Sequence, residues 1–300
     1  VIGGKVMELK SLDETKVLKD PVHSYIHIHY EVIWNCLDSK EFQRLRRIRQ
    51  LGGDFQVYPT AEHSRFSHSL GVYEIVRRMV TEVKSLCVEL TEYEKVCVTL
   101  AGLLHDVGHG PFSHAFEHIT NHSHEEYTAK IILGNTELNA ILRAVSEKLP
   151  QDIVSIIQHT HENDILNQIV SGQLDADRMD YLLRDSYFTA TSYGQFDLER
   201  ILRTIRVRKT AEGRKVIVVK YTGIHSVEDY IMARYQMYWQ VYYHPVARSY
   251  EAVFIQLFNR LKDIFKGDQD YFEDMKVLVP FLEESEVSVG EYFKLDENSL

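Results

Sequence analysis

A histidine followed directly by an aspartate, at the end of an apolar stretch, constrains this chain more than any other feature. The pair is His105-Asp106, and six of the chain's 15 histidines lie between His105 and His124. A histidine nitrogen and a carboxylate oxygen side by side suit a divalent metal of intermediate hardness, such as manganese, iron or magnesium. A lone histidine on an apolar face is more often an ordinary core residue, but a cluster of them predicts a metal site.

The residues after this pair indicate where it must lie in the fold. Adjacent residues on a helix point about 100° apart, so both side chains can reach one ion only near a helix end. Gly108, Gly110 and Pro111 follow within five residues of Asp106, and such residues end a helix and bend the chain back. We therefore expect a helix from about Glu92 to Val107 that carries the pair at its end.

Composition predicts a soluble globular protein of one large domain or two. The chain has 300 residues, of which 44% are hydrophobic, and no apolar run of the length that a membrane helix needs. Three cysteines without metal-site spacing suggest reduced thiols and a cytoplasmic protein. The net charge of −10 argues against a nucleic acid as the main partner, since such binding needs a basic face. Local arginine clusters fit small anionic ligands or, equally well, solvated helix faces.

The coarse secondary structure is mostly helical. Residues 16–30 read as short extended pieces, and 206–221 as a hairpin with its turn at Glu212-Gly213. Asp38, with Glu41 three residues on, predicts a capped helix start, and Ser226 with Asp229 predicts another. Further helices are expected from about Ser64 to Val83 and over 124–133, 137–148, 150–160, 162–171, 175–187 and 247–266.

Two of these helices direct polar residues to one face. His68 lies one turn before Val72 in an apolar stripe, so it faces inward, where a ligand for a buried ion would have to be. Asp177, Tyr181 and Asp185 recur every four residues and share one helix face.

The spacing of His68, His105-Asp106 and Asp177 resembles the metal set of the HD-domain phosphohydrolases. Longer motifs make the chain similar to the deoxynucleoside triphosphate triphosphohydrolases within that group, from about Lys16 to Arg248. These motifs are Phe42-Gln43-Arg44-Leu45-Arg46, Gln50-Leu51-Gly52-Gly53, His63-Ser64-Arg65-Phe66-Ser67-His68-Ser69-Leu70-Gly71, the run from His105 to His114, and Asp175-Ala176-Asp177-Arg178-Met179-Asp180-Tyr181.

The resemblance implies a mainly α HD-domain fold with small β-hairpin elements. It divides the chain into an amino-terminal extension (1–15), the phosphohydrolase domain (16–266) and the start of a carboxyl-terminal region (267–300) that we expect to continue in the full-length protein. It implies one divalent metal ion per active site, most simply magnesium, manganese or iron, with zinc or nickel as alternatives. The implied metal ligands are His68, His105, Asp106 and Asp177.

The implied reaction is hydrolysis of a dNTP to deoxynucleoside and inorganic triphosphate. By position, His114 is the expected proton donor to the 5′ oxygen, oriented by Glu117, while His124-Glu125 matches a second catalytic pair and His109 is expected to contact phosphate. The matching substrate positions are Arg65, Arg178 and Arg234 for the phosphates, Gln50, Tyr181 and Asp185 for the sugar, and Leu51 and Tyr238 for the base, while Tyr242 crowds the 2′ face of the sugar.

The resemblance also implies a regulatory site between subunits of a homotetramer, activated by dGTP. The matching residues are Lys16, Val17, Asp38, Gln43 and Arg46. A carboxylate can accept hydrogen bonds from guanine N1 and N2, and arginine or glutamine can donate to O6.

Two other classes of function stay open. An HD hydrolase acting on a nucleoside monophosphate, a cyclic dinucleotide or a single-stranded nucleic acid would use the same metal ligands. A nucleotide sensor would bind without turnover, although proton-transfer groups beside the metal argue against it.

Overall fold

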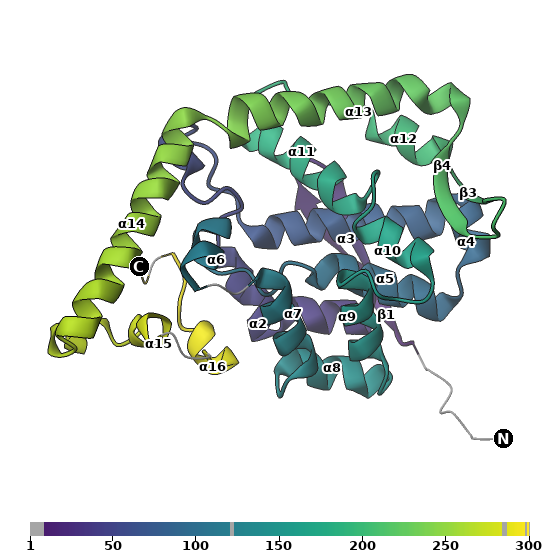
Figure 1. Ribbon diagram of the computed structural model, residues 1–300. Coiled ribbons are helices and arrows are strands. Elements are labelled where there is room, and N and C mark those ends of the chain that lie inside the picture. Colours follow the sequence, from purple (N-terminus) through teal and green to yellow (C-terminus); the bar gives the residue numbers. More distant parts are fainter. Residues whose placement is uncertain (1–8, 121–122, 284–286, 298, 300) are drawn as a thin grey trace.

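The computed structural model describes residues 9–120, 123–283, 287–297 and 299, without the side chains of His114, Ile119 and Thr120. Its described part is mainly helical with two small antiparallel hairpins, which confirms the predicted fold class. At its centre α3 (Arg65–Glu82) packs against α5 (Glu92–Leu104) and α11 (Ala176–Phe188) (Figure 1). Two of the predicted metal ligands lie on α3 and α11, and the His105-Asp106 pair directly follows α5.

Close packing between α3 and α11 depends on Gly71. A Cβ atom at this position would lie only 1.8 Å from Oδ1 of Asp180 and 2.4 Å from the guanidinium of Arg184. The glycine therefore allows a buried ion pair of α11 to lie directly against the backbone of α3.

Shorter helices surround this centre and complete the main hydrophobic core. The four helices over residues 124–170 begin and end close to where the sequence predicts them, because their apolar residues recur with helical spacing. The shorter helices are α1 (Glu31–Asp38), α2 (Lys40–Gln43), α4 (Lys84–Glu89), α6 (His114–Thr120), α7 (His124–Leu133), α8 (Glu137–Val145), α9 (Leu149–Ile157) and α10 (Asp164–Val170).

Both predicted extended regions form hairpins. In the first, β1 (Ser11–Asp20) pairs with β2 (Ser24–Tyr30), and in the second β3 (Ile205–Lys209) pairs with β4 (Lys215–Val219). Because β1 begins at Ser11, this strand crosses the boundary that the sequence places at residue 16.

The last third of the chain forms an outer layer. From α12 (Leu198–Thr204), the chain continues into α13 (Ile224–Met237), a π-helical turn (Tyr238–Tyr242) and the long α14 (Pro245–Gly267). In Figure 1, α14 runs down the left edge and the chain then returns through α15 (Val279–Leu282) and α16 (Val289–Tyr292) below α6. A second apolar cluster, which includes Phe116, Tyr127 and Phe258, joins this layer to the helices that follow His105-Asp106.

Two predicted helix starts are wrong. Asp38 is the last residue of α1, and the cap of α2 is Ser39, whose Oγ accepts from the amide of Phe42 at 3.3 Å. Glu41 is buried and accepts from the backbone of Glu137 instead of closing a capping box, and the chain continues as a 3-10 turn over Arg44–Arg47. Helix α13 begins at Ile224, two residues before the predicted Ser226 cap.

The sequence did not predict α1, α4, α6, α12, α15, α16 or the π-helical turn. Within the described ranges, no helix combines the length and the apolar character that crossing a membrane requires.

Candidate active site

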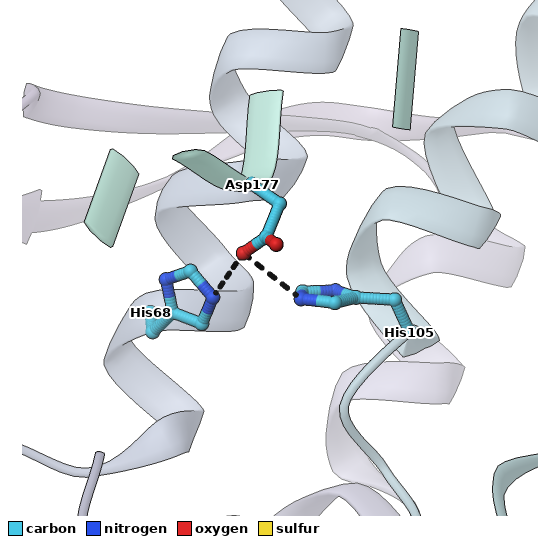
Figure 2. Close-up of side chains that lie close together, drawn as sticks. All are labelled: His68, His105 and Asp177. Atoms are coloured by element: carbon cyan, nitrogen blue, oxygen red, sulfur yellow. Dashed lines mark hydrogen bonds and ion pairs between the residues drawn. The ribbon is translucent and has the colours of Figure 1, made fainter. Parts of the chain in front are cut away.

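Three predicted metal ligands converge from separate helices. His68 lies in the first turn of α3, His105 directly follows α5, and Asp177 lies in the first turn of α11. Figure 2 shows the Asp177 carboxylate between the two imidazoles. Its Oδ1 is 3.0 Å from Nε2 of His68 and 3.6 Å from Nε2 of His105.

The fourth predicted ligand, Asp106, faces the same point. Its Oδ1 lies 3.3 Å from Nε2 of His105, and its Oδ2 lies 3.8 Å from Nε2 of His68. Burial alone would raise the pKa of Asp106, but His105 and the Arg65 guanidinium, whose NH1 lies 2.5 Å from Oδ2, hold it well below its usual range. Asp106 is therefore an anion at neutral pH.

This set of residues fits a divalent metal. Nδ1 of His105 bonds the carbonyl of Gly102 at 2.9 Å, which leaves Nε2 aimed into the site, buried and without a hydrogen-bond partner among the described residues. Burial by itself lowers the pKa of His68, yet hydrogen bonds to Asp177 and Asp180 raise it to about 10. The carboxylates thus create a negative potential that favours a cation, and two nitrogen and two oxygen donors suit one.

A buried ionic network lies behind His68. Nδ1 of His68 bonds Asp180 Oδ2 at 2.8 Å, and Asp180 also pairs with Arg184 at 2.9 Å and with Nε2 of His23 at 2.6 Å. Both Asp180 and Arg184 are fully buried. A carboxylate in this position fixes the tautomer and the ring orientation of a metal-binding histidine.

A second group of histidines lies beside the metal ligands. The rings of His109 and His124 stack with centroids 3.8 Å apart, and Nδ1 of His124 lies 2.5 Å from Oε1 of Glu117. Burial and the charge of Arg65 lower the pKa of His109 well below its usual range, so this ring is neutral. Ligand atoms of Asp106, His109 and His124 also lie within 4.8 Å of one another, close enough to hold a metal ion.

For the predicted proton donor, His114, the structure describes the backbone alone. His114 begins α6, but its side chain lies outside the described residues, so its pairing with Glu117 stays a prediction. The structure brings Glu117 to His124 instead, while Glu125 lines the cleft described next.

The four predicted metal ligands, His109 and His124 line one cleft with a volume of about 560 Å³. This size lies in the range typical of small-ligand sites. The described lining includes most of the predicted substrate residues, namely Gln50, Leu51, Arg65, Tyr181, Asp185, Tyr238 and Tyr242. Arg178 and Arg234 are not among them: Arg178 bonds Asp175 and the carbonyl of Gly172, and Arg234 lies over the ring of Tyr238.

Several residues that line the cleft or support its walls were not predicted from the sequence. His63 bonds Oδ1 of Asp185 at 2.8 Å while Tyr242 donates to Oδ2 at 2.8 Å, so both oxygens of this carboxylate are held. The spacing of Asp177, Asp180 and Arg184 on one helix was a usable signal for the network behind His68. Asp54, which also lines the cleft, had no such signal in the sequence.

The predicted regulatory residues lie outside the described cleft lining. Lys16, Val17 and Asp38 are exposed, and Nε of Arg46 bonds Gln43 at 2.7 Å while its guanidinium lies 3.6 Å from the ring centre of Phe66. Their role as a nucleotide site stays a prediction.

Two family models match the chain. The HD domain model covers residues 65–185, and the HD associated region model covers 196–294. The first range contains all four predicted metal ligands, and the second forms most of the outer layer.

Known proteins of several kinds are similar to this chain. An uncharacterized Bacillus subtilis protein, YwfO, is 50% identical over 96% of the chain and 65% of its own length. The deoxynucleoside triphosphate triphosphohydrolase SAMHD1 of Danio rerio is 30% identical over 83% of the chain and 45% of its own length. The chain thus spans roughly half to two thirds of these curated relatives.

A solved structure is also similar to this chain. The crystal structure of a phosphohydrolase from Bacteroides thetaiotaomicron is 31% identical, has a TM-score of 0.78, and is matched over 95% of this chain and 70% of the other. The converging His68, His105, Asp106 and Asp177, the family models and this relative agree, and the chain belongs to the HD-domain family, with an HD domain followed by an HD-associated region.

Proposed function

We propose that this chain is a metal-dependent dNTP triphosphohydrolase that releases deoxynucleoside and inorganic triphosphate. The observation that carries the proposal is a two-histidine, two-aspartate set at the base of a cleft whose walls hold a cationic arginine and paired tyrosines. The similarity to SAMHD1, named as a deoxynucleoside triphosphate triphosphohydrolase, supports the substrate class.

The residues around the metal set suit phosphoryl chemistry. A divalent ion held by His68, His105, Asp106 and Asp177 supplies a Lewis acid and lowers the pKa of a bound water. Arg65 is buried beside Asp106, where its charge can offset negative charge on a phosphate.

Proton transfer has a candidate pair beside this set. The hydrogen bond between His124 and Glu117 holds an imidazole at the cleft wall in a fixed orientation. His114 remains the predicted proton donor to the departing 5′ oxygen.

The tyrosine wall supports selection of deoxyribose. Tyr242 donates to Asp185 and its ring lies 6.0 Å from that of Tyr181, centre to centre. An aspartate with both oxygens held can accept from a sugar hydroxyl in a fixed place, while the ring of Tyr242 takes up space that a 2′ hydroxyl would need.

Product analysis tests the reaction. The purified chain is incubated with Mn²⁺ or Mg²⁺ and each dNTP, alone and with dGTP added, and the products are separated by anion-exchange chromatography. We expect deoxynucleoside and intact triphosphate in equal amounts. Orthophosphate would point to another phosphoester reaction, and binding without turnover of any nucleotide would point to a sensor.

Activation by dGTP and assembly into a homotetramer form the second part of the proposal. Gln43 and Arg46 lie together on the surface, outside the cleft lining, and could donate to guanine O6. In Arg46→Ala, activation by dGTP should be lost, whereas Arg143→Ala, an exposed arginine of α8, should keep it. Full activation of Arg46→Ala would show that the site is misplaced.

A further inference from the structure

The loop that carries the His-Asp pair has an unusual backbone at its far end. Two consecutive non-glycine residues, Phe112 and Ser113, adopt the left-handed conformation with φ of 57° and 52°. Such residues are energetically unfavourable, and they persist only where the surroundings hold them. We refer to residues 105–113 as the His-Asp loop.

This backbone places a hydroxyl against the metal set. Oγ of Ser113 accepts from Nε and NH2 of Arg65 at 3.1 and 2.8 Å and donates to the carbonyl of Arg49 at 3.1 Å. The same arginine bonds Asp106. The conformation of Ser113 therefore fixes the direction in which Arg65 presents its charge.

The His-Asp loop is held by side chains at the far end of the chain. Glu297, whose side chain is 2% exposed, accepts with Oε1 from the amides of Phe112 and Arg49 at 3.2 and 3.0 Å, and with Oε2 from the guanidinium of Arg49 at 2.8 Å. Tyr292 donates its hydroxyl to the carbonyl of Gly108 at 2.7 Å. Both belong to residues 289–297, which we call the C-terminal segment.

Further contacts fix the C-terminal segment in place. Arg44 bridges it to the loop, since one nitrogen donates to the carbonyl of His109 at 2.7 Å and another to the carbonyl of Leu295 at 3.2 Å. The ring of Tyr292 stacks on Tyr127 with centroids 3.8 Å apart. A Cβ at Gly110 would lie 3.0 Å from the Tyr292 hydroxyl, so the loop approaches the segment closely.

We propose that the C-terminal segment holds the His-Asp loop in its strained conformation, with Glu297 as the positioning residue that sets Ser113 and, through it, Arg65. Within the loop the Ser113 amide donates to the carbonyl of Gly110 at 3.2 Å, and Glu297 adds an acceptor for the amide of Phe112, the first of the two left-handed residues. Loss of this carboxylate would leave the amides of Phe112 and Arg49 without an acceptor and release the loop.

Hydrogen exchange and kinetics on the 300-residue chain test this inference. In Glu297→Ala, we expect exchange of the amides over 108–113 to accelerate by about 10-fold or more, the effect of one lost buried hydrogen bond. The kinetic part rests on the proposed function: kcat for dNTP hydrolysis should fall by about 10-fold with a smaller change in KM. Glu297→Gln keeps an acceptor for both amides, so it should restore most of the protection from exchange in the loop and most of kcat.

Matched controls separate positioning from general damage. Glu291→Ala removes an exposed carboxylate of the same segment that accepts hydrogen bonds from Ser288, and it should leave loop exchange and kcat unchanged. Where Glu297→Ala does not fold, Tyr292→Phe removes only the hydroxyl on Gly108 and should still accelerate loop exchange. Loop exchange equal in Glu297→Ala, Glu291→Ala and the parent would overturn the inference. Because exchange needs no substrate, this result is independent of whether the chain hydrolyses dNTPs.

Discussion

On one side of the cleft, His68 and Asp177 project from two long packed helices, whereas on the other side His109 and Ser113 lie on a loop with a left-handed backbone. The helical side is supported by Asp180 and Arg184 of α11 and by His23, which lies between β1 and β2. The loop side is supported by residues 184 and 185 positions further along the chain, which contact Gly108 and Phe112.

From this difference we infer that the two sides of the cleft have different roles. Ligands on packed helices are fixed before any ion arrives, as a metal site of defined geometry requires. Groups at the far end of the His-Asp loop, such as Ser113, depend on remote contacts, so their position can change with less effect on the ligands. We therefore expect damage to the helical side to affect metal binding, and damage to the loop side to affect turnover.

Removal of a ligand should have the largest effect. In Asp177→Ala, we expect kcat to fall by roughly 10³-fold or more, because several kcal/mol of transition-state stabilisation depends on the bound ion. Activity assays and metal analysis by mass spectrometry check this, with Asp229→Ala on the exposed face of α13 as the control. Wild-type metal content and kcat in Asp177→Ala would exclude this carboxylate as a ligand.

Replacing the support behind the ligand should have a smaller effect. Asp180→Asn keeps the size of the side chain but removes the charge that orients His68 and balances Arg184, so we expect Mn²⁺ affinity to fall by about 10- to 100-fold. Titration followed by electron paramagnetic resonance measures this directly. Unchanged affinity together with a lower kcat would contradict the division between the two sides.

The smallest effect is expected at the cleft rim. Burial, with the nearby charges of Asp185 and Glu251, raises the pKa of Asp54 to about 7 from an ordinary value of 3.8. The folded chain then binds more protons than the unfolded chain between these values, so this group lowers stability as pH rises through the window.

The Asp54→Asn variant has no charge to bury at this position. The free energy of unfolding of the variant minus that of the parent should therefore be larger at pH 8 than at pH 5. The increase should be about 1–2 kcal/mol once solvent screening is included. Urea denaturation at the two pH values measures the difference. An equal stability difference between variant and parent at pH 5 and pH 8 would show that the Asp54 carboxylate is well solvated.

The helical side could be predicted from the sequence because its signals are local. Apolar periodicity located α3, and the His105-Asp106 pair with its glycines located the end of α5. The spacing from Asp177 to Asp185 likewise indicated which face of α11 meets the cleft. Each of these signals lies within two or three helical turns.

The features that could not be predicted from the sequence depend on contacts between distant parts of the chain. Asp38 and Ser39 are both good caps, and what decides between them is Glu41, which is buried against the start of α8. The π-helical turn over Tyr238–Tyr242 has no local signature. The roles of Tyr292 and Glu297 could not be foreseen, because nothing near them in the sequence indicates that they meet the His-Asp loop.

The most direct test of this account is the position of the metal ion in crystals grown with Mn²⁺, read from anomalous diffraction. The account predicts one strong peak at about 2.0–2.4 Å from donor atoms of His68, His105, Asp106 and Asp177. A peak only among Asp106, His109 and His124, or none at saturating Mn²⁺, would contradict the claim that the two sides of the cleft meet at one ion held by these four residues.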